Sequence, residues 1–321
     1  MKRILFRGLL LAAAAVVLPA HAQHYPSKPV KIVVPFPPGA LTDTLARLLA
    51  GRLQEKWGQS VIVDNRAGAS GNIGTESVFR SDPDGHTLLF TPQAPLVIAK
   101  LLNPKLAFDP DRLAPVAVVT RSTVVVVANP KTPFTNIRQL IDYAKANPGR
   151  LNFASTGFGS TAHLSNELLF EMSGIKGVNV PYQGITPAST ALQAGEVDVL
   201  FDAMGHALTS IQAGKLRILA VAGAARSDAL PDVPTVAETL PGFLSTLWTG
   251  VVAPPGTPAG IVNKISADIA EALKHPEFAG RIDKLNGIEA VGSTPAEMNE
   301  VMREERERWA RVIRVTGVKT E

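Results

Sequence analysis

The chain has 321 residues, of which 45% are hydrophobic and 19% are charged, and it contains no cysteine. This length allows about two domains, and stability must come from buried cores because no disulfide can form. The formal net charge is +4, but Lys2, Arg3 and Arg7 lie in the first few residues. Without them 29 basic residues face 28 acidic ones. This balance excludes the concentrated basic face of a nucleic-acid-binding protein.

The N-terminus predicts a secretory signal peptide over residues 1–22. The three basic residues precede the apolar run LLLAAAAVVLPA, and the small-residue triplet Ala20-His21-Ala22 follows. The run is shorter than the ~20 residues that a membrane-spanning helix needs, and the triplet has the form of a cleavage site. We therefore predict export and removal of the peptide after Ala22.

After the signal peptide, short β-branched runs alternate with longer segments of helical period, which is typical of an α/β protein with mostly parallel sheets. The predicted strands are residues 30–36, 60–64, 87–91, 116–119, 123–128, 151–154, 177–180, 197–201, 216–222 and 247–253. The predicted helices are residues 42–57, 72–80, 135–147, 164–172, 188–194, 206–213, 258–274 and 294–313.

Ten strands are too many for one small sheet, so the pattern predicts two lobes. The chain is expected to cross between them near residues 125 and 250, where extended stretches run into proline-bounded turns. Residues 23–122 together with 248–321 would then form a discontinuous first lobe, and residues 123–247 a second lobe.

Four predicted strands end in similar turns of glycine, proline and hydroxyl residues, each followed by a helix start. The turns are PPGALTD, NRAGASGN, STGFGST and PYQGITP. In an open parallel sheet such turns gather at the carboxyl edge, where helix N-termini present unpaired N–H groups and a partial positive charge. Such a site binds anions without arginine. Arg66 is the single basic residue in these turns, and a surface pair with Asp64 is its expected role.

Three kinds of chemistry are disfavoured by the spacing of the candidate residues. The stretch 157–161 reads GFGST, with glycine where the serine of a GxSxG nucleophile motif should stand. Ser160 and His163 are three residues apart, as a helix-capping serine would also be. The glycines at 68, 71 and 74 do not form the GxGxxG dinucleotide motif, and the histidines are scattered. We expect no catalytic residue, no metal and no cofactor.

The roles of three polar side chains stay open at this level. Asp202 follows the apolar run VDVLF and can cap the next helix or bind a ligand. Asp43, in the first turn of a predicted helix, can stabilise that helix or accept a hydrogen bond from a ligand. Tyr182 can line a pocket or pack between the lobes.

The sequence resembles the tripartite tricarboxylate transporter substrate-binding proteins, the Bug family of bacterial periplasmic receptors, over essentially all of residues 25–321. Single motifs are ordinary turns, but their order is specific. They are VPFPPGALTDTLARLLA, VIVDNRAGASGNIGTESV, SDPDGHTLLF, KANPGRLNFASTGFGSTAHLSNELL, VPYQGITPA, FDAMGHALTSIQAGKLRILAV, ALPDVPTVAE and VVAPPGTPAGIV. The resemblance implies a two-lobed periplasmic binding protein, and we expect a monomer of the type II-like class. Its interlobe cleft would hold a small carboxylate, delivered to a membrane permease of two subunits.

The resemblance also implies which residues contact the ligand, and Tyr182 is added as a candidate from its turn. The implied contacts are Phe36, Gly39, Ala40, Thr42, Asp43, Gly71 and Thr91 in one lobe, and Thr156, Gly157, Ser160, His163 and Asp202 in the other. The family commonly has two or three glycines where this chain has Gly39-Ala40-Leu41, so we expect a narrower cleft on that side.

Two other functions remain as alternatives. One is an exported enzyme acting on a small carboxylate ester or amide. The other is a periplasmic ligand sensor that docks on a membrane receptor. The sequence leaves the ligand open among dicarboxylates, tricarboxylates, amino acids, aromatic acids and neutral amides.

Overall fold

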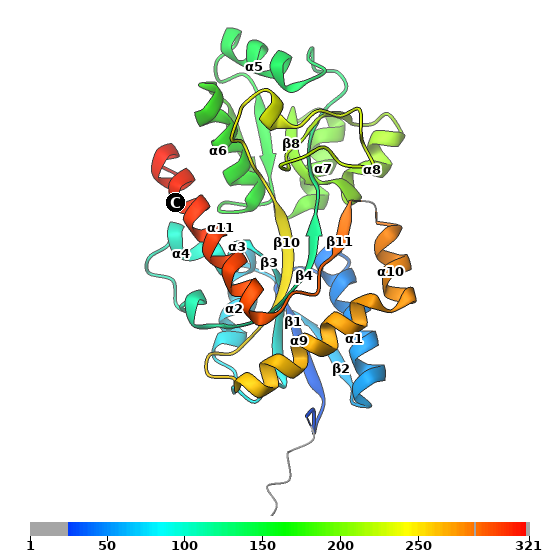
Figure 1. The fold of residues 1–321 in the computed structure, drawn as a ribbon. Coiled ribbons are helices and arrows are strands. Elements are labelled where there is room, and N and C mark those ends of the chain that lie inside the picture. Colours follow the sequence, from blue (N-terminus) through cyan, green and yellow to red (C-terminus); the bar gives the residue numbers. More distant parts are fainter. Residues whose placement is uncertain (1–24, 286, 319–321) are drawn as a thin grey trace, which may run out of the picture.

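A computed structural model of the chain describes residues 25–285 and 287–318. The predicted signal peptide and its cleavage site lie outside the described residues. The chain forms two lobes, one above the other in Figure 1, and each lobe is a β-sheet with helices on both faces. The predicted two-lobed α/β fold is confirmed.

The first lobe contains a six-stranded sheet in the order β11-β4-β10-β3-β1-β2. Its strands are β1 (Val30–Val34), β2 (Val61–Asn65), β3 (Thr87–Pro92), β4 (Ala114–Ser122), β10 (Leu247–Ala253) and β11 (Ile288–Ala290). Strands β1, β2 and β3 run parallel, whereas β10 is antiparallel to both β3 and β4. Val30, Ile32, Val33 and Val34 of β1 are fully buried because helices cover both faces of this strand.

Two hydrophobic cores cover the two faces of this sheet. On one face lie α1 (Leu41–Trp57), α9 (Ala259–Lys274) and α10 (Pro276–Asp283), with Leu45, Leu49 and Ile269 among their core residues. On the other lie α2 (Asn72–Phe79), α3 (Ala94–Val97), α4 (Ala99–Leu102) and α11 (Pro295–Thr316). Helix α1 ends where predicted, because Gly58 adopts a left-handed conformation and caps it.

The second lobe contains a five-stranded sheet in the order β7-β6-β8-β5-β9. Its strands are β5 (Val124–Ala128), β6 (Asn152–Ser155), β7 (Val178–Pro181), β8 (Val199–Ala203) and β9 (Arg217–Val221). Helices α5 (Ile137–Ala146) and α6 (Thr161–Ser173) pack on one face, and α7 (Ile185–Ala194) and α8 (Met204–Gln212) on the other. Short 3-10 helices cover Ala69–Gly71, Pro110–Arg112 and Val236–Glu238.

Both sheets are mixed, where the sequence predicted mostly parallel ones. The difference comes from the segments that connect the lobes. Strand β4 of the first sheet leads through Thr123 into β5 of the second, and β5 enters its sheet antiparallel to β8 and β9. Strand β10 returns to the first lobe beside β4, and Figure 1 shows the two strands side by side. The predicted lobe boundaries at residues 122 and 248 stay a prediction that this strand membership supports.

All predicted strands and helices are present, but β11, α3, α4 and α10 were not predicted. Strand β11 has three residues, and α3 and α4 have four residues each, so they are too short to show a period. Helices α6, α7 and α8 begin two or three residues earlier than predicted, because their first turns are rich in glycine, proline and hydroxyl residues. Within the described chain, no helix combines the length and apolar character needed to span a bilayer.

Candidate functional site

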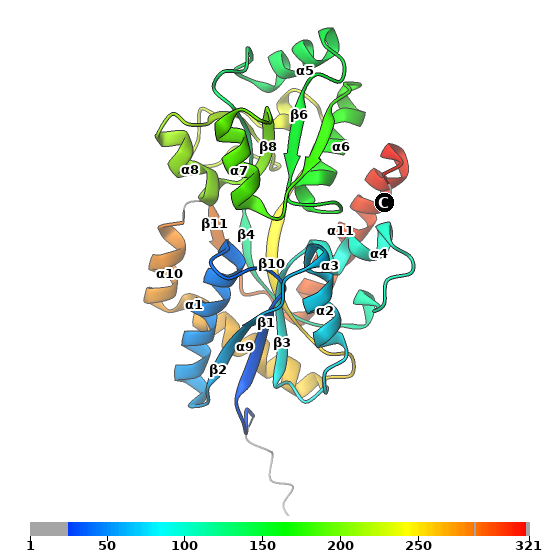
Figure 2. The same cartoon turned by 180° about the vertical axis from the view of Figure 1, so that it is seen from behind.

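The carboxyl ends of the parallel strands of both sheets point toward the boundary between the lobes, which we call the seam. Figure 2 shows β1 and β3 of the first lobe pointing up to the seam and β6 of the second lobe pointing down to it. Helices α1, α2, α6, α7 and α8 follow these strands and therefore begin at the seam. The partial positive charges of their N-termini act on the same region, as the sequence predicted.

Asp43 organises the turn between β1 and α1. One carboxylate oxygen accepts hydrogen bonds from the Gly39 N–H at 2.9 Å and Arg47 Nε at 3.0 Å, and the other accepts from Asn65 Nδ2 at 2.9 Å. Burial alone would raise the pKa of Asp43, but these hydrogen bonds and Arg47 lower it. Asp43 is therefore ionised and fully paired, so it shapes the turn that presents Gly39, Ala40 and Thr42.

The residues that were expected to narrow the cleft are only half-buried. Leu41 and Phe36 both pack against the core under α1. Ala40 is the extended residue that precedes α1, and its side chain makes no capping hydrogen bond. The leucine side chain thus contributes to the first lobe's core, which offsets the expected narrowing.

Gly71 begins α2 with a φ of 97°, which favours glycine. A Cβ at this position would lie 2.9 Å from Pro95 Cγ and 3.3 Å from Phe36 Cζ. Only a glycine lets the start of α2 approach Phe36 this closely. Thr91, by contrast, is fully buried between β1 and β10, and its hydroxyl donates to the Pro92 carbonyl at 3.1 Å. It presents no exposed atom at the seam.

The turn that contains Thr156, Gly157, Ser160 and His163 leads from β6 into α6. Ser160 is the N-cap residue, and its Oγ accepts the His163 N–H at 3.2 Å. The Gly159 N–H donates to Nδ1 of the His163 ring at 3.0 Å, and the Ser160 N–H donates to the Gly157 carbonyl at 3.2 Å. The side chain of His163 therefore holds the turn in shape.

Two backbone N–H groups of this turn, those of Gly159 and Ser160, form hydrogen bonds inside the turn and are not free to bind an anion. Those of Gly157, Phe158 and Thr161 have no protein acceptor within the described chain. Burial lowers the pKa of His163 to about 4, so the ring is neutral at pH 7. The Gly159 N–H makes Nδ1 the acceptor, which places the ring proton on Nε2.

The strand register brings three other predicted residues to one row at the seam. Ser155 pairs with Pro181 of β7, and Ala154 pairs with Leu200 of β8. Continuing both parallel pairings places Thr156 beside Tyr182 and Asp202. Tyr182 is half-buried against the core between the sheet and α7. Asp202 is 3% exposed.

Asp202 is not the N-cap of the following helix, because Ala203 holds that position without a side-chain hydrogen bond. The capping role that the sequence left open is therefore wrong. Oδ2 of Asp202 accepts a hydrogen bond from Nδ1 of His206 at 2.6 Å, and Oδ1 is buried without a partner. Burial raises the pKa of Asp202, and the hydrogen bond to Asp202 raises the pKa of His206.

The lobes touch directly beside the predicted site. Ser70 Oγ, in the turn before α2, donates to the Phe158 carbonyl at 3.2 Å. Gln93 is fully buried, and its Nε2 donates to the Thr246 carbonyl at 2.9 Å and to Thr161 Oγ1 at 3.3 Å. A cavity of about 150 Å³ opens at this contact, lined by Ser70, Asn72, Ala94, Pro95, Ala99, Leu102, Asn103, Phe158 and Gly159.

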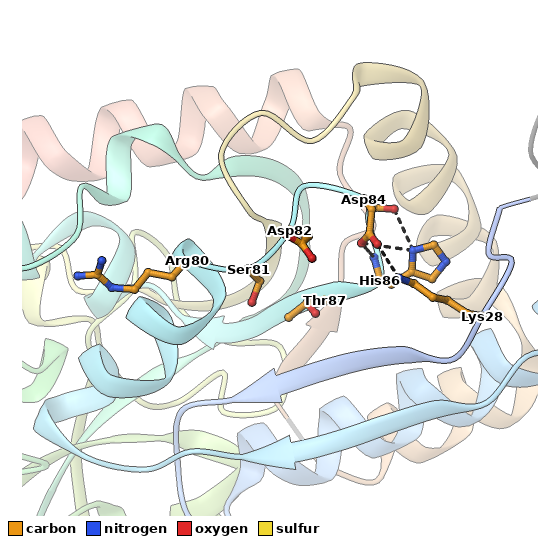
Figure 3. A pocket seen from close by; sticks show the side chains of 7 residues that line it. All are labelled: Lys28, Arg80, Ser81, Asp82, Asp84, His86 and Thr87. Carbon is orange, nitrogen blue, oxygen red and sulfur yellow. Dashed lines mark hydrogen bonds and ion pairs between the residues drawn. The ribbon is translucent and has the colours of Figure 1, made fainter.

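A larger cavity of about 260 Å³ lies elsewhere, at the amino end of β3 (Figure 3). Lys28 and Asp84 in its wall form an ion pair of 2.8 Å, and His86 is held by the backbone and side chain of Asp84. This edge of the sheet is opposite to the seam, and the paired charges stabilise the local turn. None of the predicted ligand contacts lines it.

The comparisons with known proteins agree with this architecture. The model of the "tripartite tricarboxylate transporter family receptor" matches residues 45–318. The chain belongs to this family. It is 38% identical to the protein BugT of Bordetella pertussis over 315 residues, which cover 97% of this chain and 96% of BugT. The resemblance that the motif order indicated is thereby confirmed, and the chain is a member of a family of periplasmic solute receptors.

Solved structures of similar proteins give the same result. Rpa4515 of Rhodopseudomonas palustris, solved with adipate, is 34% identical, with a TM-score of 0.86 over 92% of this chain and 99% of that one. MatC of the same organism, solved with bound malate, is also 34% identical, with a TM-score of 0.83 over 90% of this chain and all of MatC.

The sequence analysis did not name four residues of the seam as candidate site residues: Ser70, Gln93, Phe158 and His206. Ser70 lies in a turn with a positive φ of 53°, which its sequence context suggests only weakly. Gln93 follows a buried strand and has no motif around it. His206 was grouped with the scattered histidines, because only the structure shows that it pairs with Asp202.

Proposed function

We propose that this receptor binds a small carboxylate at the seam, with one carboxylate group on the turn between β6 and α6. The observation that carries the proposal is that this turn has backbone N–H groups that are not used by the described residues of the protein. The N–H groups of Gly157, Phe158 and Thr161 lack protein acceptors in the part of the chain described, and the Ser160 hydroxyl can still donate while its oxygen caps the helix. Helix N-termini stabilise anions through such groups. Apart from Thr91, which is fully buried, the residues named as contacts from the sequence remain part of this proposal, Asp202 through its hydrogen bond to His206.

The same geometry favours binding over catalysis. A Ser–His pair needs a hydrogen bond between the serine hydroxyl and the imidazole. Here Ser160 Oγ faces the His163 backbone N–H, and the ring nitrogen Nδ1 accepts from Gly159. A receptor without turnover is therefore our proposal, and the exported enzyme is the alternative that the experiment below also tests.

Short dicarboxylates are the first ligands to test, because two family members of similar structure were solved with adipate and malate. A ligand with two anionic ends suits a seam where helix N-termini of both lobes converge.

Thermal unfolding of the purified mature protein with a library of carboxylates tests this proposal. A ligand at 100 times its Kd adds about 2.7 kcal/mol of stability, which raises the melting midpoint by several degrees for a chain of this size. The compounds to be tested are succinate, malate, adipate, citrate, aspartate, benzoate and acetamide. No shift with any of them, together with hydrolysis of a carboxylate ester or amide, would favour the enzyme.

Delivery to a two-subunit permease, the periplasmic location and a monomeric state complete the proposal. The family description supports the first two. Intact mass of material secreted through the native leader should start at Gln23, and a mass that includes Met1 would contradict export with cleavage after Ala22. Ligand uptake that depends on both the receptor and a permease pair would separate transport from sensing.

A further inference from the structure

The side chain of His206 is the feature of the seam that the proposed function does not yet use. Asp202 is almost completely buried, and the His206 ring is the one side chain of the described residues that forms a hydrogen bond with its carboxylate. The His206 side chain, in contrast, is 30% exposed. A buried carboxylate thus holds an imidazole whose other nitrogen, Nε2, has no protein partner among the described residues.

This pair lies where the lobes meet. Helix α8 begins at Met204, whose N–H donates to the carbonyl of Thr123, the residue that joins β4 to β5. Met204 also packs against Gly287 of the first lobe so closely that a Cβ on Gly287 would overlap it. His206 is in the first turn of the same helix, and Asp202 continues the row that contains Thr156 and Tyr182. The pair therefore belongs to the edge of the proposed ligand site.

Other basic side chains of the surrounding turns are already paired. Arg47 binds Asp43 and Asn65, and Arg66 binds Asp64. Helix α8 packs on β5, whose residues are valine and alanine, and on β8, which supplies only Asp202 as a titratable group. Among the described residues, Asp202 is the group that raises the pKa of His206, through a hydrogen bond and through its charge.

We infer that His206, oriented by the buried Asp202, is a ligand contact that donates from Nε2 to a second anionic group of the ligand. This inference rests on the proposed function and names the ligand class as dicarboxylate. One carboxylate would bind the turn before α6, and the other would bind His206 at the N-terminus of α8. Asp202 acts through His206 and is a positioning residue.

The geometry makes this contact depend on protonation in a defined way. As long as Asp202 is ionised, it only accepts hydrogen bonds, so Nδ1 of His206 carries a proton in both states of the ring. When the ring is charged, Nε2–H faces the ligand as a donor. When the ring loses a proton, Nε2 is left with a lone pair, which repels a carboxylate. Affinity for a dicarboxylate should therefore fall as pH rises through the pKa of His206.

Calorimetric titration of succinate and its monocarboxylate match butyrate tests the inference. In His206→Gln the affinity for succinate should fall by about tenfold or more, as expected for a lost charge-assisted hydrogen bond, while the affinity for butyrate changes by less than about twofold. His275→Gln, which removes an exposed histidine before α10, is the control and should bind both ligands normally.

The dependence of succinate affinity on pH distinguishes a direct ligand contact of His206 from a purely structural role of this residue. Wild-type affinity for succinate should fall by up to about tenfold per pH unit above the His206 pKa, because one proton is linked to binding. Asp202→Asn should shift this fall to lower pH, and NMR titration of His206 should show that succinate raises its pKa.

The outcomes also separate this inference from the function on which it rests. If succinate binds with the same affinity and pH profile in wild type and His206→Gln, while Ser160→Ala weakens it, the receptor function stands and the role of His206 is wrong. If no carboxylate binds the wild-type protein, both are wrong.

Discussion

Gln93 of the first lobe donates a hydrogen bond to the hydroxyl of Thr161, the first residue of α6 in the second lobe. The same amide nitrogen donates to the carbonyl of Thr246, just before β10 returns to the first lobe. Thr246 is in turn bound through its hydroxyl to Glu305 of α11. One buried side chain thus connects α6, β10 and the helix that closes the first lobe.

Hydrophobic contacts reinforce this connection. Leu164 and Leu168 of α6 belong to the same core cluster as Trp309 and Met302 of α11. Helix α6 is therefore packed against the first lobe along one side, although its strand neighbours are in the second. Opening of the lobes is expected to leave this side in place and to separate the side that contains α1 and α8.

We predict that Gln93→Leu destabilises the protein by about 0.5–1.5 kcal/mol, because the half-buried Thr246 carbonyl loses its donor. Because α6 starts directly after Ser160, ligand affinity should fall as well. Urea unfolding and calorimetry measure both effects.

A double-mutant cycle with Thr161→Val isolates the interlobe hydrogen bond. The two substitutions should be coupled by about 0.5–1.5 kcal/mol, because each removes the same bond. Gln139→Leu, at an exposed glutamine in the first turn of α5, is the control. Additive effects of Gln93→Leu and Thr161→Val would show that the contact contributes no stability.

Ser160→Ala should weaken carboxylate binding by roughly ten- to a hundredfold, since it removes one charge-assisted hydrogen bond of about 1.5–3 kcal/mol. Loss of the helix cap should lower the free energy of unfolding by a smaller amount, about 0.5–2 kcal/mol. Ser160→Thr keeps the hydroxyl and should restore most of both. Wild-type affinity in a folded Ser160→Ala protein would show that this serine is only a cap.

Gly157→Ala should weaken binding more than it destabilises the fold. Gly157 has a φ of 120°, and an added Cβ would lie 3.1 Å from Ser70 Oγ of the other lobe. The substitution therefore strains the backbone and also pushes on the interlobe contact. Gly149→Ala is a matched control, because Gly149 has a φ of 74° and an added Cβ would meet no atom within 4 Å.

Both glycine variants place a side chain at a positive φ, at a cost of about 1–3 kcal/mol each, measured by thermal unfolding. Calorimetry should show reduced ligand affinity in Gly157→Ala alone. Equal affinity in both variants would mean that the tip of the turn does not approach the ligand or the other lobe in the bound state.

The sequence predicted most of the fold because its signals are local. Alternation of valine-rich runs with amphipathic segments indicated the strands and long helices, and Gly58 marked the end of α1. The mixed character of the sheets was missed, because strand direction in β5 and β10 depends on how the chain passes between the lobes.

The ligand site could be predicted from the sequence only where consecutive residues form it, as in a single turn. The turn at residues 155–161 could be recognised, but the use of its Gly159 N–H by His163 depends on a ring orientation that no spacing indicates. The hydrogen-bonded pairs Asp202–His206 and Gln93–Thr161 could not be predicted from the sequence either, at a short and at a long separation along the chain. The first pair spans one helical turn, and the second joins residues 68 positions apart.

His163 should make the protein lose stability in acid. Burial lowers its pKa from 6.5 to about 4 in the folded state, so between these values the unfolded chain binds a proton that the folded chain does not. The contribution of His163 is complete above about pH 6.5 and is lost as the pH falls toward 4, amounting to at most about 3 kcal/mol. Glu167, 3.7 Å from Nε2, does not prevent this, because burial raises its own pKa.

Urea unfolding of wild type and His163→Gln at pH 7 and pH 4.5 measures this effect. Glutamine can still accept the Gly159 N–H but does not titrate, so the variant should lose less stability than wild type over this interval. His275→Gln is the control for a histidine-to-glutamine change elsewhere in the chain; because it removes the acceptor that caps α10, the loss of stability between the two pH values is compared and not the absolute stability. Equal losses in wild type and His163→Gln would show that the folded protein protonates His163 as readily as the unfolded chain. In that case the Gly159 N–H does not hold Nδ1, and the turn must keep its shape by the Ser160 cap alone.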